Sequence, residues 1–68
     1  ERRYIGRIHG QVDQAIALLE SRGARVESRG ARYLFDLGDK LTTSDLLRLC
    51  DRASVSVIEL VPVSRALS

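Results

Sequence analysis

The side chains that could carry out chemistry in this chain are few. The sequence contains one histidine, His9, and one cysteine, Cys50, and either would need a second polar group within hydrogen-bonding reach to act as a base or nucleophile. His9 lies between an expected strand and an expected helix without such a partner, and we interpret it as a solvated or capping residue. Cys50 falls on the apolar stripe of an expected helix, so we interpret it as a buried structural thiol. The sequence therefore predicts no catalytic residue and no enzyme.

Metal and nucleotide sites lack their usual ligands and loops. One cysteine and one histidine cannot supply the four ligands of a usual zinc site, and a single cysteine cannot form an internal disulfide. Neither G-x-x-x-x-G-K-[ST] nor G-x-G-x-x-G occurs in the sequence, so we expect no phosphate-binding loop of these kinds. The sequence predicts no cofactor and no metal in this chain.

Arginine accounts for all but one of the 11 basic residues. Four arginines cluster in the middle of the chain: Arg22, Arg25, Arg29 and Arg32. The pentapeptide Ser-Arg-Gly-Ala-Arg occurs at 21–25 and again at 28–32, and an arginine-rich segment can bind phosphate or nucleic acid. However, Glu20, Glu27 and Asp36 are interleaved with these arginines, the formal net charge is only +2, and glycines at element boundaries are explained by turn conformation. We therefore expect no nucleic-acid partner.

The elements that position these side chains follow from hydrophobic periodicity. Residues 4–8 predict a short strand, and Gly10 marks a turn into a helix over about 11–22. Four apolar residues of this helix fall at i, i+3, i+4 and i+7: Val12, Ala15, Ile16 and Leu19. Gly23 stands where the left-handed residue after a helix is expected.

The second half of the chain repeats this order. Residues 24–28 and 31–37 predict a hairpin with one apolar face, and Thr42-Thr43-Ser44-Asp45 is a helix-capping signal. The helix that follows has the same apolar spacing as the first: Leu46, Leu49, Cys50 and Ala53. Residues 55–61 predict a last strand, in which Ile58 and Leu60 would share one face and Val57 and Val61 the other, so the side that meets the helices stays open.

Two strand-helix-strand units joined by a hairpin predict one α+β domain over residues 1–68. The expected fold is the ferredoxin-like split βαβ arrangement (βαββαβ), a four-stranded antiparallel sheet with two helices on one face. With 68 residues, the chain can bury only about 60% of its unfolded surface, which allows one modest core. Glu1-Arg2-Arg3 at the start and the absence of methionine suggest that the chain is an excised fragment of a larger protein.

Composition indicates an ordinary soluble domain, with 44% hydrophobic and 29% charged residues. No apolar stretch approaches the ~20 residues that cross a bilayer, and no signal-peptide core follows the basic start.

Several spaced motifs resemble a known family. They are Leu-Glu-x-x-Gly-Ala-x-Val at 19–26, Leu-Thr-Thr-Ser-Asp-Leu-Leu-Arg-Leu at 41–49, Val-x-Val-Ile-Glu-Leu at 55–60, and Pro-Val-x-x-x-Leu at 62–67. With this spacing the chain resembles, over nearly all of its length, the C-terminal accessory domain of bacterial ABC-transporter ATP-binding (ATPase) subunits of the drug- and sodium-export type.

The resemblance implies a non-catalytic domain with regulatory or assembly contacts. Its partner would be the parent ATPase domain or a second copy of the chain, as in a homodimer, with indirect association with a membrane permease. The location would be cytoplasmic, at the inner face of the membrane. ATP and Mg would belong to the parent, because the family's nucleotide-binding motifs lie upstream. In the family a terminal helix follows the position of Pro62, and residues 65–68 would reach its start.

The candidate contact surface is the sheet face that the helices leave open, carrying Arg32, Leu34 and Asp36. Its mixed charge is equally consistent with a solvated face. Two other functions stay open. One is an ACT-like small-molecule-sensing regulatory domain, which shares this topology; Gly10, at the turn from the first strand into the first helix, is the one feature of the chain that resembles it. The other is a single-stranded RNA-binding module that uses the arginine-rich hairpin.

Overall fold

The structure, a computed structural model, describes residues 3–63. Its elements, in chain order, are β1 (Arg3–Gly10), α1 (Val12–Ser21), β2 (Arg25–Arg29), β3 (Arg32–Asp36), α2 (Thr43–Arg52) and β4 (Val55–Pro62). The expected order of six elements is confirmed, and the fold is α+β with a four-stranded antiparallel sheet and two helices. The start of a terminal helix expected at residues 65–68 lies outside the described residues.

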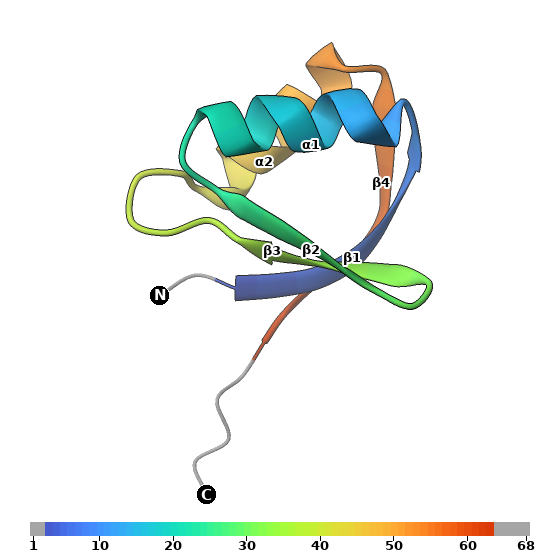
Figure 1. The fold of residues 1–68 in the computed structure, drawn as a ribbon, viewed down its shortest axis with the longest axis horizontal. Coiled ribbons are helices and arrows are strands. Elements are labelled where there is room, and N and C mark those ends of the chain that lie inside the picture. The colour runs from blue at the N-terminus through green and yellow to red at the C-terminus, as the bar shows by residue number, and fades with distance from the viewer. Residues whose placement is uncertain (1–2, 64–68) are drawn as a thin grey trace, which may run out of the picture.

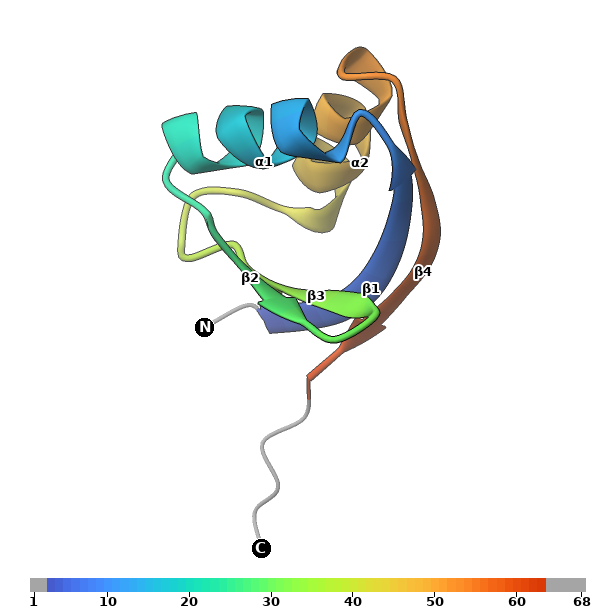
Figure 2. The same ribbon diagram turned by 45° about the vertical axis from the view of Figure 1, so that its right-hand side comes forward.

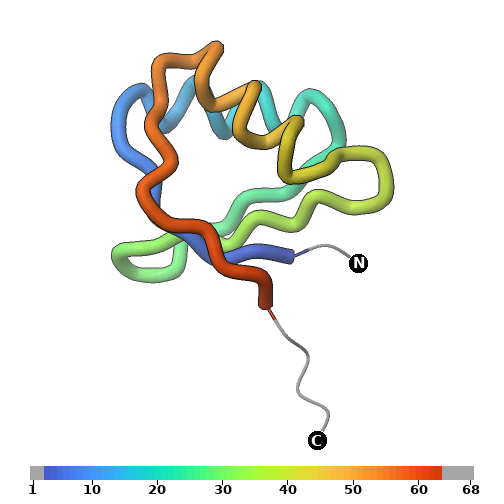
Figure 3. The backbone as a smooth tube through the Cα atoms, turned by 180° about the vertical axis from the view of Figure 1, so that it is seen from behind, coloured from blue at the N-terminus to red at the C-terminus, as the bar shows by residue number. Residues whose placement is uncertain are grey.

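The sheet has the strand order β2-β3-β1-β4, and each pair of neighbouring strands is antiparallel. Both helices lie on the same side of it (Figure 1), and β1 and β4 bend around the ends of the helices (Figure 2). Seen from behind, β4 runs beside β1 along its length (Figure 3). Neither helix between residues 3 and 63 is long and apolar enough to cross a membrane.

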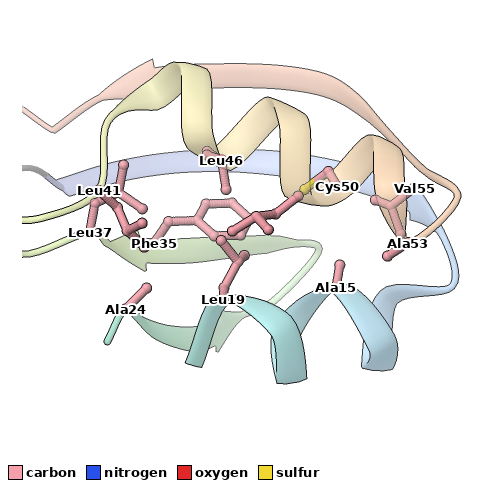
Figure 4. Close-up of a cluster of buried hydrophobic side chains, with 11 residues drawn as sticks. Ala15, Leu19, Ala24, Phe35, Leu37, Leu41, Leu46, Cys50, Ala53 and Val55 are labelled. Carbon is pink, nitrogen blue, oxygen red and sulfur yellow. The ribbon is translucent and has the colours of Figure 1, made fainter. Parts of the chain in front are cut away.

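The core fills the space between the sheet and the helices. Phe35 of β3 is completely buried and lies between side chains of α1 and α2 (Figure 4). The buried apolar residues are Ala15, Leu19, Ala24, Phe35, Leu37, Leu41, Leu46, Leu49, Cys50, Ala53 and Val55. All four residues of the stripe predicted for α2 are among them, whereas Val12 and Ile16 of the α1 stripe are half-buried.

The predicted capping signal starts α2. The Thr42 hydroxyl accepts a hydrogen bond from the Asp45 backbone N–H at 3.2 Å, and the Thr42 backbone N–H donates to Asp45 Oδ2 at 3.0 Å. These reciprocal bonds satisfy two donors that a helix start leaves unpaired. The pKa of the Asp45 carboxyl is lowered by the Thr42 backbone N–H and by the Thr42 hydroxyl, which donates to Oδ2 at 3.2 Å, and the charges of Arg48 and Arg22 add to this effect. By contrast, Gln11 at the start of α1 makes no side-chain capping bond.

Each helix is followed by a residue with positive φ, but the two side chains differ. Gly23 comes directly after the C-cap residue of α1 and has φ +98°, as predicted, and Ser54 comes directly after the C-cap residue of α2 and has φ +61°. An L-residue in this left-handed region is crowded by its Cβ, which glycine lacks. Ser54 therefore holds strain that Gly23 avoids.

A β-bulge in β4 corrects the expected alternation of its side chains. Arg7 pairs with Glu59 and Ile8 with Val57, so Ile58 is an extra residue. The alternation that put Val57 with Val61 is therefore wrong: Val57 and Leu60 both pack against the core, while Ile58 is 63% and Val61 49% exposed. Beside the bulge, a Cβ on Gly6 would collide with the Glu59 carbonyl oxygen, so this approach of the strands needs glycine.

Replacing Ser54 by glycine is expected to stabilise the fold by about 0.5 to 1 kcal/mol. It removes a left-handed strain of about 1 to 2 kcal/mol, and part of this gain is lost because glycine raises the conformational entropy of the unfolded chain. Chemical denaturation would measure this change in the free energy of unfolding. The matched variant Ser56→Gly lies in extended β4 and should lose stability. A lower stability for Ser54→Gly would show that the Ser54 side chain is needed.

Replacing Thr42 by alanine is expected to cost about 1 kcal/mol, because one side-chain cap is lost. The folded pKa of Asp45 lies below its ordinary value of 3.8, so its stabilising effect is present above that value and is lost as the pH falls through the folded pKa. The variant keeps the backbone N–H that bonds the carboxylate but loses the hydroxyl that also donates to Asp45 Oδ2. The difference in stability between wild type and variant should therefore shrink in denaturation curves taken from about pH 6 down to about pH 2. Thr43→Ala, one residue further on, is the control, and a pH-independent difference would contradict the bond from the Thr42 hydroxyl to the Asp45 carboxylate.

Candidate functional site

The candidate site is the face of the sheet that points away from both helices, here called the open sheet face. Successive side chains of a strand point to opposite faces, and Phe35 and Tyr33 point toward the helices. The open sheet face carries Arg3, Ile5 and Arg7 from β1, Arg25, Glu27 and Arg29 from β2, Arg32, Leu34 and Asp36 from β3, and Glu59 and Val61 from β4. The structure thus brings the three residues predicted from β3 together on this face.

An apolar row crosses the middle of the open sheet face. Leu34 pairs with Ile5, and Ile5 pairs with Val61, so the three side chains stand side by side on β3, β1 and β4. Leu34 and Ile5 are half-buried by their neighbours, and Val61 is 49% exposed. Val63, which is 40% exposed, continues the apolar surface beyond β4. A shallow hollow of about 230 Å³ opens beside Ile5 and Val61.

Ion pairs flank this row. Arg32 Nε lies 3.1 Å from Glu59 Oε1, a contact that reaches from β3 over β1 to β4. Arg3 lies 3.7 Å from Asp36, and Arg29 lies 3.4 Å from Glu27. All of these side chains are between about a third and two thirds exposed, so each pair contributes at most about 1 kcal/mol to stability.

Asp36 also has a local structural role. Its Oδ1 accepts a hydrogen bond from the Gly38 backbone N–H at 3.2 Å, which holds the turn that follows β3. Of the three predicted surface residues, Arg32 and Asp36 therefore have polar partners within the chain, whereas Leu34 places an apolar side chain on the open sheet face.

The open sheet face carries an excess of positive charge. Five arginines share it with three carboxylates, and each carboxylate pairs with one arginine. Arg7 and Arg25 form no ion pair within residues 3–63. Their guanidinium groups can take a carboxylate from outside the chain as a bidentate ligand.

Sequence reasoning missed Ile5, Arg7 and Val61. A signal for Ile5 was available, because Ile5 and Ile8 are three positions apart on one strand and must point to opposite faces. Val61 could not be assigned without the bulge at Ile58, which changes the alternation between the two ends of β4.

His9 and Cys50 differ in burial: His9 is exposed and Cys50 lies in the core. His9 belongs to β1 and pairs with Ser56, so placing it between strand and helix was wrong; it is exposed, as a solvated histidine would be. Cys50 is completely buried in the core, as predicted, and burial raises the pKa of its thiol. Within residues 3–63, no group of three or more His, Cys, Asp or Glu side chains is arranged to hold a metal ion.

The repeated pentapeptides coincide with backbone turns. Gly23 and Gly30 both have positive φ, +98° and +63°, so the glycines are explained by local conformation. The chain's three aromatic residues, Tyr4, Tyr33 and Phe35, lie in the core or pack against it, and the ring of Tyr33 faces that of Phe35 at 6.3 Å. The aromatic side chains are therefore not displayed on the open sheet face for base stacking.

No protein-family model matches this chain, and no match was found among curated proteins or solved structures.

Native Cys50 is expected to react with a thiol-specific reagent at least about 100-fold more slowly than the unfolded chain at the same pH, because reaction needs both opening of the core and loss of the thiol proton. Absorbance-monitored labelling would measure the two rates. A Cys50→Ala/Ser44→Cys variant, with its thiol on an exposed position of α2, is the control. Equal labelling rates for Cys50 and the exposed thiol would contradict its structural role.

Proposed function

We propose that this chain is a non-catalytic interaction module that binds another protein through the open sheet face, as the accessory domain of an ABC-transporter ATPase subunit. The observation that carries the proposal is the apolar row of Ile5, Leu34 and Val61, which lies in register across three strands on the face without helices. In that setting the partner would be the ATPase domain of the same protein or a second copy, at the cytoplasmic side of a permease.

We also propose that the fold is the ferredoxin-like split βαβ arrangement. Read from the other edge, the strand order is β4-β1-β3-β2, in which the two strand-helix-strand units interleave. Each unit places its helix on the same side of the sheet (Figure 1). An antiparallel sheet of this kind has one face packed on helices and the other free for water or a partner.

Covering the apolar row with a partner would contribute favourably to the free energy of binding. Full burial of one aliphatic side chain is worth about 1.5 to 3 kcal/mol relative to full exposure. Leu34 and Ile5 already start half-buried, so a partner would gain part of this from each. A stable complex would need contacts beyond the row, because specific interfaces cover about 800 Å² per partner.

Features of the two edge strands favour a contact on the face. The edge strand β4 contains a bulge at Ile58 and ends at Pro62. The other edge strand, β2, exposes Arg25, Glu27 and Arg29. Bulges, prolines and charges are the usual features that prevent an edge from pairing with another sheet, so strand addition is the less favoured mode of contact.

The alternatives have less support. Gly10 is the one feature that suggested an ACT-like domain. It has φ +127°, and a Cβ there would collide with the Ser54 carbonyl oxygen. The backbone conformation alone therefore explains why this residue is glycine. Base stacking by single-stranded RNA would require aromatic rings on the open sheet face, and Tyr33 packs on the other side.

Leu34→Gln is expected to weaken binding about tenfold, because it replaces apolar contact by an amide that must be desolvated. The measurement is sedimentation equilibrium of the chain from micromolar to millimolar concentration, alone and with a purified export-type ABC ATPase domain. Val61→Gln tests the same row on β4. Leu47→Gln is the matched control, since Leu47 is 48% exposed on α2 in the helical layer.

Association that is weakened by both changes in the row and unaffected by Leu47→Gln would support the proposal. A chain that stays monomeric and ignores the ATPase domain would contradict it. Dimerisation driven by added amino acids would favour a sensor domain instead.

A further inference from the structure

Charge is divided between the two layers of the molecule. The open sheet face has two more arginines than carboxylates. In the helical layer and its connections, the acidic residues are Asp13, Glu20, Asp39, Asp45 and Asp51, and the basic residues are Arg22, Lys40, Arg48 and Arg52. That layer is therefore slightly acidic, and the positive excess of residues 3–63 lies on the face that carries the apolar row.

The arginines lie on both flanks of the row. On β1, Ile5 stands between Arg3 and Arg7, and on β2, Glu27 stands between Arg25 and Arg29. Residues two apart on a strand are about 7 Å apart, so the two flanks are separated by about 14 Å. An α-helix with its side chains is about 10 to 12 Å wide and fits between them.

We propose that the open sheet face binds an acidic amphipathic helix of a partner protein, an inference that rests on the proposed function and adds the chemistry of the partner. Aliphatic side chains of the helix would cover Ile5, Leu34 and Val61. Its carboxylates, on both sides of that stripe, would pair with Arg7 on one flank and Arg25 on the other. Neither pairing requires a break in the ion pairs of Arg3, Arg29 or Arg32.

A second copy of the chain is less suited to this face. Packing two open sheet faces against each other would set one arginine excess against an identical one, which opposes association. Packing the face on the helical layer of the next copy would be a head-to-tail contact, which propagates into rings or filaments rather than closing as a two-fold dimer.

Polyanions that lack an aliphatic stripe also fit less well. Glu27, Asp36 and Glu59 are interleaved with the arginines, so a nucleic-acid backbone or an anionic bilayer would meet carboxylates as well as guanidinium groups. A helix can place neutral and acidic side chains individually, and its stripe of apolar residues recurs at every third or fourth position.

The test uses a synthetic 18-residue helical peptide with leucine on one face and glutamate on both flanks, titrated into the chain by calorimetry. Arg7→Gln/Arg25→Gln should weaken binding about tenfold, because two charge-assisted pairs are lost. Arg22→Gln/Arg52→Gln makes the same change in charge on the helical layer and should change the affinity less than twofold. Raising the salt from about 50 to 500 mM should weaken binding to the wild type.

Three further probes separate the possible outcomes: the same peptide with lysine for glutamate, vesicles of phosphatidylglycerol, and oligouridylate. Stronger binding of any of these than of the acidic peptide would overturn the inference, as would equal effects of the two double variants. If Leu34→Gln weakens association with the ATPase domain about tenfold while the arginine changes do nothing, the proposed function stands and the acidic partner is wrong. If Leu34→Gln has no effect on any complex, the proposed function itself fails.

Discussion

The packing of Phe35 against the two helices is the contact on which the other features depend. Its ring is completely buried between β3, α1 and α2 (Figure 4), so it fixes which face of the central strands meets the helices. Once that choice is made, strand alternation sends Arg32, Leu34 and Asp36 to the opposite face. The position of one aromatic core residue thus determines which polar groups reach the candidate site.

The open sheet face joins a small apolar surface to an unbalanced set of charges. The ion pair between Arg32 and Glu59 spans β1, and the pair between Arg3 and Asp36 lies on the other flank of the row. Pairs of this exposure add little to folding, and their effect is rather to fix where guanidinium groups and carboxylates stand. The resulting pattern is a means of selecting among partners more than a source of stability.

Local features could be predicted from the sequence, whereas features that join distant segments could not. The cap at Thr42 and Asp45 and the left-handed Gly23 depend on neighbouring residues, and both were predicted. The α2 stripe followed from its period, and with the hairpin it predicted the α+β architecture. The bulge at Ile58 depends on how β1 and β4 pair, and the ion pair over β1 depends on strand order, so neither can be obtained from a single segment. The resemblance to ABC-transporter subunits remains a prediction.

The unequal caps of the two helices have a consequence for motion. The start of α2 is fixed by reciprocal bonds with its own first turn, whereas α1 begins at Gln11 without a side-chain cap. Short helices are marginal without packing, so α1 depends on the core to a degree that α2 does not. Brief openings of the native chain should therefore begin at the amino end of α1, and the backbone amides of this turn should exchange with solvent hydrogen before those of α2 do.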